Sequence, residues 1–122
     1  IGKENYVESD SLIIKVKELE KKHPYSFLEA VDEYMLKSKF NEASFIYFVG
    51  LMRFKYYNSV NPDYNDNKLL NKYEDTYGGY IGHYLRTNAD NFIKILQISI
   101  DYYINNDFTF FSKIHSTAPR FW

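Results

Sequence analysis

The sequence has no cysteine, which excludes disulfide bonds, thiolate nucleophiles and cysteine-bound zinc. An excess of positive charge is also missing, because 15 Lys and Arg residues are balanced by 16 Asp and Glu residues, for a net charge of -1. Without a basic field, the chain is not expected to bind nucleic acid. The longest apolar run covers residues 45–52, whereas a membrane-spanning helix needs about 18 to 20 such residues. We therefore expect neither a nucleic-acid partner nor a membrane span.

Glycine and proline are scarce, with 5 and 3 copies among 122 residues, and apolar residues recur every three or four positions along most of the chain. This spacing is the period of an α-helix. A chain of this length with 45% hydrophobic residues can bury one core, so we expect a single domain over residues 1–122. The fold class predicted from the sequence is all-α, a bundle of five or six antiparallel helices around a central apolar helix.

Capping residues and apolar spacing predict where these helices lie. The expected helices cover residues 9–22, 26–38, 41–61 and 68–86, a fifth begins with a capping pattern at residues 87–90, and a short sixth turn lies within residues 107–115. In the first helix, Leu12, Val16 and Leu19 share one face. Ser26 and Glu29 have the spacing of a capping box at the start of the second helix. The fifth helix carries Phe92, Leu96, Ile100 and Tyr103 at helical spacing.

The helix expected at residues 41–61 is apolar on nearly every side between residues 43 and 57, so we place it at the centre of the bundle. Gly50 would let a neighbouring backbone approach this helix closely. Arg53 lies among its apolar residues, and a buried guanidinium must be paired to be tolerated. We expect an internal ion pair or a snorkelling side chain at Arg53; the alternative is a basic point at the floor of a groove.

The aromatic content is high, with 13 Tyr, 10 Phe and 1 Trp. Four of the tyrosines, spaced by four, three and four residues, form a stripe along the helix expected at residues 68–86. Such a stripe packs into a core, but tyrosine is also enriched in protein interfaces because it combines a large contact area with a polar tip. Nearby acidic side chains outnumber the lysines, which would suit a basic partner. The candidate partner-binding residues are Tyr64, Tyr73, Tyr77, Tyr80, Tyr84, Asp63, Asp66 and Glu74.

Residues 63–74 also match the ligand spacing of an EF-hand calcium loop, with oxygen-bearing side chains at the first, third, fifth and ninth positions and Glu74 at the twelfth. At the sixth position, where such loops turn sharply at a glycine, this chain has Lys68. A polar loop that caps the following helix explains the same residues without a metal. The alternative function that stays open is a calcium-binding helical protein using Asp63, Asn65, Asn67 and Glu74.

The sequence contains no motif that is typical of a catalytic site. The three histidines lie on different predicted elements, and Glu20 with His23 gives only one half of a di-iron motif, beside two lysines. No serine lies in a nucleophile elbow, and the glycine-rich residues 78–82 do not follow a strand. Carboxylates that are adjacent in sequence point to different sides of a helix. We therefore expect no cofactor and no enzymatic activity.

Two short stretches resemble known families. Residues 40–43 are similar to the turn into the second helix of a tetratricopeptide pair, a spacing also reproduced by Phe27, Tyr34, Ala43 and Tyr47. Residues 41–54 (NEASFIYFVGLMRF), followed by residues 61–62, resemble small helical bacterial immunity proteins, which are encoded beside secreted antibacterial toxins. This resemblance implies a noncatalytic protein of the bacterial cytoplasm or periplasm that binds and blocks a cognate toxin. The expected partner is thus another protein, and a small-molecule pocket between aromatic-lined helices is a third interpretation.

Overall fold

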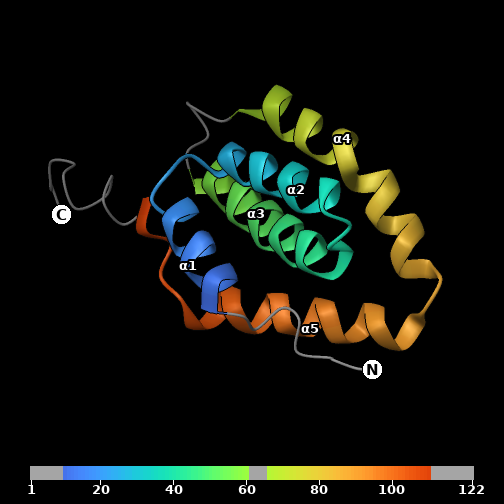
Figure 1. Cartoon of the computed structure of the whole chain (residues 1–122). Helices are drawn as coiled ribbons and strands as arrows, with labels where there is room; N and C mark the ends of the chain where they lie inside the picture. The colour runs from blue at the N-terminus through green and yellow to red at the C-terminus, as the bar shows by residue number, and fades with distance from the viewer. Residues whose placement is uncertain (1–9, 61–65, 111–122) are drawn as a thin grey trace, which may run out of the picture.

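The computed structural model describes residues 10–60 and 66–110. Over these residues the chain is all-α and contains no strand. Its elements are α1 (Asp10–Leu19), the 3-10 turn η1 (Pro24–Ser26), α2 (Phe27–Leu36), α3 (Phe40–Val60), α4 (Asn67–Arg86) and α5 (Ala89–Asn105). Helix α3 is central and contacts α2, α4 and α5 (Figure 1). The predicted fold class is confirmed, with five α-helices in the described part of the chain.

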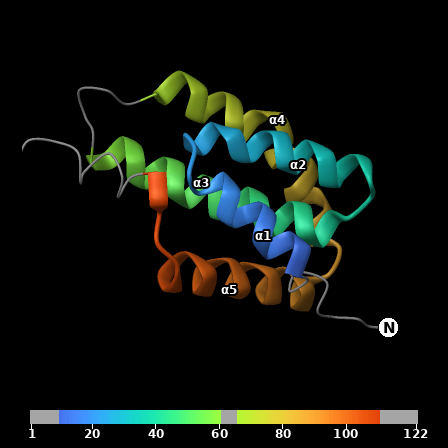
Figure 2. The same ribbon diagram turned by 60° about the vertical axis from the view of Figure 1, so that its left-hand side comes forward.

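Helix α3 lies at the centre because apolar residues cover most of its circumference. The two views together show α2 on one side of α3 and α5 on the other (Figures 1 and 2). The buried residues of α3 are Ala43, Ser44, Phe45, Ile46, Tyr47, Val49, Gly50, Arg53 and Phe54. A helix that is covered on several sides removes a large apolar area from water, and this burial is the main force that holds the bundle together.

Gly50 marks very tight packing around α3. A methyl group at this position would lie 2.2 Å from the Tyr73 hydroxyl oxygen and 2.6 Å from the Phe27 Cβ atom. The close packing expected at Gly50 is present, but the groups that approach it are the side chains of Tyr73 and Phe27 and not the backbone that we expected. Tyr73 is fully buried there, and its ring stacks on Tyr47 with centroids 5.3 Å apart. Its hydroxyl donates a hydrogen bond of 2.9 Å to the Tyr47 carbonyl oxygen, so the buried polar group is satisfied.

The start of α2 differs from the sequence prediction. Ser26 has helical backbone angles and its side chain makes no capping hydrogen bond, so the predicted capping box with Glu29 is wrong. The turn before α2 is held instead by His23, whose Nδ1 accepts a hydrogen bond of 3.1 Å from the Tyr25 backbone N–H. Pro24 occupies the first position of η1, where the N–H that proline lacks would have no helical partner. The 3-10 turn thus takes the place of a serine cap.

The start of α5 is capped one residue later than the sequence pattern indicated. Asn88 has extended backbone angles, and its side-chain oxygen accepts a hydrogen bond of 3.0 Å from the Asn91 backbone N–H. The Thr87 hydroxyl instead donates a hydrogen bond of 2.6 Å back to the Tyr84 carbonyl oxygen at the end of α4. Each polar side chain therefore satisfies a different helix end, and Asn88 is the true N-cap.

Helix α5 presents to α3 a different face from the apolar stripe noted in the sequence. Its buried residues are Ile95, Ser99 and Tyr102. Phe92 and Ile100, which belong to that stripe, are 36% and 38% exposed. A small polar residue is tolerated on the buried face because the Ser99 hydroxyl donates a hydrogen bond of 2.8 Å to the Ile95 carbonyl oxygen of its own helix.

The remaining helix boundaries agree with the prediction to within a few residues. Helix α1 ends at Leu19 and not at Lys22, and its predicted inward face is confirmed by the burial of Leu12, Val16 and Leu19. Of the sixth turn expected within residues 107–115, residues 109–110 are helical and those after 110 lie outside the described residues. Within the described ranges, no helix combines the length and the apolar character that crossing a bilayer requires.

Candidate functional site: a tyrosine-lined groove between α2 and α4

A shallow groove of about 280 Å³ opens to solvent where η1 and α2 face the middle of α4. Its lining residues are Tyr25, Leu28, Glu29, Asp32, Thr76 and Tyr77. The aromatic rings and the leucine give the groove an apolar floor. The only charged groups in the lining are the two carboxylates on α2, so the groove carries negative charge at its edge and no cation.

The tyrosine stripe of α4 holds this groove open by anchoring α4 to α2 and to the start of α3. The Tyr77 hydroxyl donates a hydrogen bond to the Asp32 carboxylate across the groove. Because an ionised phenol would lie directly against that carboxylate, the contact raises the pKa of Tyr77 to about 12. Farther along, the Tyr84 hydroxyl donates a hydrogen bond of 2.7 Å to the Asn41 side-chain oxygen, and its ring packs on Phe40. The stripe therefore fixes α4 in place at two points.

The four predicted stripe residues have different positions in the structure. Tyr73 is fully buried, so its assignment to a partner-binding surface is corrected. Tyr73 is buried because it lies where α4 packs on α3, against Gly50 and the ring of Tyr47. Tyr77 and Tyr84 are partly buried by the contacts just described, whereas Tyr80 is 69% exposed. The rings of Tyr77 and Tyr80 lie 6.4 Å apart, so the exposed phenol adjoins the groove.

The acidic residues predicted for the site are used largely within the chain. The Asp66 carboxylate accepts a hydrogen bond of 2.7 Å from His23 Nε2, and Glu74 lies 3.7 Å from the Lys55 ammonium group. Asp63 and Tyr64 lie outside the described residues. The acidic edge of the groove comes instead from Glu29 and Asp32, which sequence reasoning missed. Their three-residue spacing on a short helix was the available signal, because it places both carboxylates on one face.

The geometry at residues 66–74 does not fit a calcium loop. Helix α4 begins at Asn67, so the fifth and later ligand positions are helical and cannot wrap around one ion as an EF-hand loop does. Asn67 accepts a hydrogen bond of 3.2 Å from Asn58, and Glu74 is engaged by Lys55. Asp63 and Asn65 lie outside the described residues. Throughout the described ranges, no group of three or more His, Asp or Glu side chains is placed to hold a metal ion.

Glu20 and His23, the two residues of the di-iron half-motif, make contacts within the fold. His23 is partly buried, and its Nε2 donates a hydrogen bond of 2.7 Å to the Asp66 carboxylate because Nδ1 is the acceptor for Tyr25. Its ring meets the rings of Phe54 and Tyr57 edge to face. The Glu20 carboxylate is engaged by Arg53. Both side chains therefore stabilise the fold, and His23 ties the start of α4 to the core.

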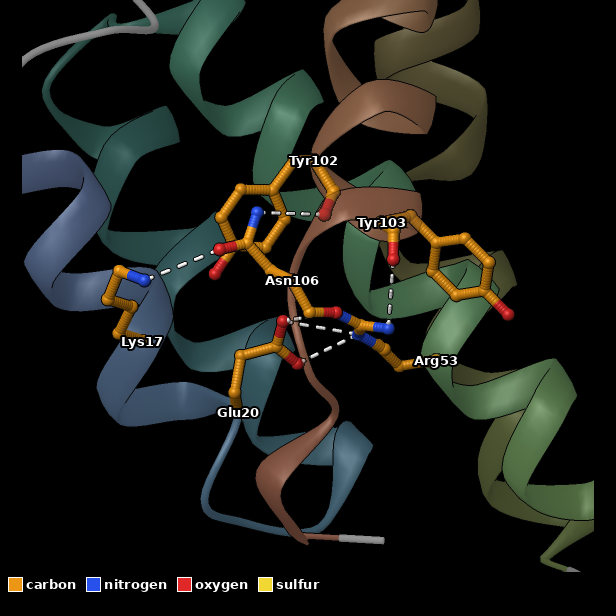
Figure 3. A network of polar contacts seen from close by, with 6 residues as sticks. All are labelled: Lys17, Glu20, Arg53, Tyr102, Tyr103 and Asn106. Atoms are coloured by element: carbon orange, nitrogen blue, oxygen red, sulfur yellow. Dashed lines mark hydrogen bonds and ion pairs between the residues drawn. The ribbon is translucent and has the colours of Figure 1, made fainter. Parts of the chain in front are cut away.

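A buried ion pair joins Glu20, just after α1, to Arg53 in α3 (Figure 3). The Arg53 Nε atom lies 2.9 and 3.1 Å from the two Glu20 oxygens, and its Nη2 atom lies 2.6 Å from one of them. The guanidinium also donates hydrogen bonds to the carbonyl oxygens of Tyr103 and Asn106 at the end of α5. The predicted internal ion pair of Arg53 is therefore confirmed, although Arg53 also belongs to the lining of an open pocket beside Tyr103 and Phe108.

Burial governs the electrostatics of this pair. The side chains of Arg53 and Glu20 are 5% and 2% exposed, and Arg53 lies over the rings of Tyr103 and Phe108. Loss of hydration raises the pKa of Glu20 above its usual value, although Arg53 acts in the opposite direction. The buried Tyr102 hydroxyl lies beside this carboxylate without forming a hydrogen bond of normal geometry. Glu20 and Arg53 thus join α1, α3 and the end of α5.

Comparison of the chain with models of protein families, with curated proteins and with solved structures gives no match. The protein is therefore described by its fold and its groove. It is an all-α bundle with a central helix and an acidic, tyrosine-lined groove on its surface.

Proposed function

We propose that this chain is a noncatalytic domain that binds a basic segment of another protein in the groove between α2 and α4. The observation that carries the proposal is the combination of an apolar, aromatic floor with the carboxylates of Glu29 and Asp32 and no cation in the lining. An apolar floor favours contact with aliphatic or aromatic side chains. The carboxylates favour the approach of Lys or Arg side chains and disfavour acidic partners.

Tyr80 extends this surface beyond the groove itself. Its ring is 69% exposed, next to the half-buried ring of Tyr77. A phenol supplies a large contact area while losing few rotamers on binding, which is why tyrosine residues often dominate the energy of an interface. We therefore expect Tyr80 to contribute more to binding than any other tyrosine of the α4 stripe.

The groove is also preorganised for binding. The Tyr77–Asp32 and Tyr84–Asn41 hydrogen bonds hold α4 against α2 and α3 in the unbound chain. A partner would not have to order these helices, so little of its contact energy would be lost to conformational entropy. Rigid helices that present an acidic surface suit a protein whose task is to cover a site on another protein.

The specific form of this proposal is an immunity protein that binds and blocks a cognate bacterial toxin. Its support is the resemblance of residues 41–54 to such proteins, together with a groove that can cover a basic surface. The direct test is to purify the toxic protein encoded beside this chain and to measure its binding by calorimetry. Co-expression should protect cells from that toxin. If the wild-type chain neither binds nor protects, the immunity function is refuted.

Two groove variants and one control locate the binding surface. Tyr80→Ala should weaken binding by about tenfold or more, as the loss of an anchoring interface tyrosine does. Glu29→Lys should also weaken binding, because it reverses a charge at the groove edge. Its loss of affinity should be larger at low salt than at high salt, since salt screens the charges. Glu18→Lys makes the same charge reversal on α1, outside the groove, and should leave affinity unchanged. Equal affinity for all three variants would contradict binding in the groove.

A further inference from the structure

The face of α5 that points away from α3 is strongly apolar. Ile93, Ile100 and Ile104 are 62%, 38% and 69% exposed, and Leu96 lies half-buried beside them. At about 3.6 residues per turn, these residues form one stripe along the helix, opposite the residues that face α3. We call Ile93, Leu96, Ile100 and Ile104 the outer stripe. A row of large apolar side chains in water is typical of a surface that another protein covers.

Two opposite charges flank the outer stripe on the same side. Lys94 and Asp101 are both exposed, and neither forms an ion pair with another described residue. They are separated by seven positions, which corresponds to about 10.5 Å along a helix axis. Gln97 lies between them along the helix, beside the outer stripe, and is also exposed. The stripe therefore has a positive end, a polar centre and a negative end.

We infer that α5 pairs with α5 of a second copy of this chain, antiparallel, about a twofold axis beside Gln97. A twofold axis exchanges positions that lie at equal distances from it. Lys94 then lies opposite the partner's Asp101, and Asp101 lies opposite the partner's Lys94. In this register Ile93 fits between the partner's Ile100 and the partner's Ile104, as side chains of paired helices interdigitate. The two Gln97 amides meet at the axis, where they can bond to each other.

The charge pattern is what selects a second copy as the occupant. A parallel pair of α5 helices would place Lys94 against the partner's Lys94 and Asp101 against the partner's Asp101, which is repulsive. In the antiparallel pair, each Lys94 lies opposite the partner's Asp101, so both contacts are attractive. The pattern is thus complementary to itself, which is the requirement for an interface with twofold symmetry.

This interface is separate from the groove proposed to bind another protein. The groove lies on α2 and α4, whereas the outer stripe lies on α5, on the other side of α3 (Figure 2). Pairing through α5 would leave both grooves of the dimer accessible. Since α5 has 17 residues and a length of about 25 Å, the contact is small for a protein interface. We therefore expect a weak dimer whose population depends on concentration.

Sedimentation velocity over a range of concentrations tests this pairing. The wild-type chain should pass from monomer to dimer as concentration rises from about 5 to 500 µM, the range in which a weak interface fills. Lys94→Asp and Asp101→Lys should each weaken the dimer by about tenfold, because each creates two like-charge contacts. The double variant, and an equal mixture of the two single variants, should recover the dimer. The helix content and melting temperature of each variant report whether its fold is intact.

A cysteine crosslink provides a second measurement of the register. The chain has no native cysteine, so Gln97→Cys introduces a single thiol near the twofold axis. Mild oxidation should join two such chains rapidly, because paired helices bring this position close enough for a disulfide. Lys68→Cys places an exposed thiol on α4 and should crosslink slowly. A wild-type chain that stays monomeric at every concentration would overturn the proposal, as would a dimer that both charge reversals leave unchanged.

Discussion

Replacing Glu20 with glutamine should destabilise the chain more than any exposed substitution. Glutamine keeps the size of the side chain, so the change removes charge and does not open a cavity. The Arg53 guanidinium would then be left charged, with an exposed fraction of only 5%, after losing the carboxylate that three of its contacts reach. Arginine cannot release its proton at ordinary pH to escape this environment. The energetic cost therefore falls on the folded state.

The magnitude follows from the burial of the pair. Removing one partner of a buried ion pair costs about 3 to 5 kcal/mol, and glutamine should fall near the lower end because its amide oxygen can still accept one hydrogen bond. For a chain of this size, that corresponds to a melting temperature lower by about 10 °C. Urea unfolding followed by circular dichroism measures the change directly. Glu18→Gln, an exposed neighbour bound only to Lys21, should change stability by less than about 0.5 kcal/mol.

Removing the other partner of the pair, by Arg53→Met, should destabilise the chain by an amount that depends on pH. Glu20 would then be buried without its cation, but a carboxylate can protonate where a guanidinium cannot lose its proton. Burial already raises the pKa of Glu20 in the native chain. A raised folded-state pKa means that the favourable contribution is present below the usual carboxyl pKa and is lost as the pH rises through the raised value. Arg53→Met should therefore be closer to wild type at pH 4.5 than at pH 8.

A loss of less than about 1 kcal/mol for Glu20→Gln would refute this reasoning, because it would show that Arg53 finds hydration or another partner at no cost. The same holds if Arg53→Met has the same destabilising effect at both pH values. A local readout is also available, because the Phe110 backbone N–H donates a hydrogen bond of 2.7 Å to the Glu20 carbonyl oxygen. Hydrogen exchange at this amide should accelerate when Arg53 no longer holds the end of α5.

Three further predictions concern packing, ionisation and capping. Gly50→Ala should cost about 1 to 3 kcal/mol of unfolding free energy through overpacking, whereas Gly79→Ala, with open space around it, should gain about 0.5 to 1 kcal/mol. Burial raises the pKa of Tyr73, and the hydrogen bond to Asp32 raises that of Tyr77 to about 12. An alkaline titration followed at 295 nm should therefore show a fraction of the tyrosines that ionises later than the rest. Stability should fall above pH 10 as buried phenols ionise. Asn88→Ala should cost about 1 kcal/mol in thermal unfolding through loss of the α5 cap.

The helical periodicity allowed the fold class, the central helix and most helix boundaries to be predicted from the sequence. The apolar circumference of α3 is a local property, so its central position followed without any knowledge of the neighbours. The requirement that a buried Arg53 be paired was also predictable. Its partner Glu20 was not, because the residues are 33 positions apart in the sequence and only the tertiary fold brings them together.

The surface was harder to predict, because periodicity shows that a helix has faces but does not show what each face meets. Tyr73 and Tyr80 belong to one stripe, yet one is fully buried and the other is 69% exposed. In α5, large apolar residues occur both on the buried face and on the outer stripe, so the sequence alone could not tell which one would meet α3. The groove combines residues of α2 and α4, and its acidic edge depends on how these helices pack.

The most direct test of protein binding in the groove is a photocrosslink from position 80. A photoreactive phenylalanine analogue replaces Tyr80 in cells that also make the neighbouring toxin, and a second strain carries the analogue in place of Lys94 on α5. Binding in the groove predicts a crosslinked product with the toxin from position 80 and none from position 94. A toxin crosslink from position 94 alone, or protection from the toxin with no crosslink at position 80, would contradict the account.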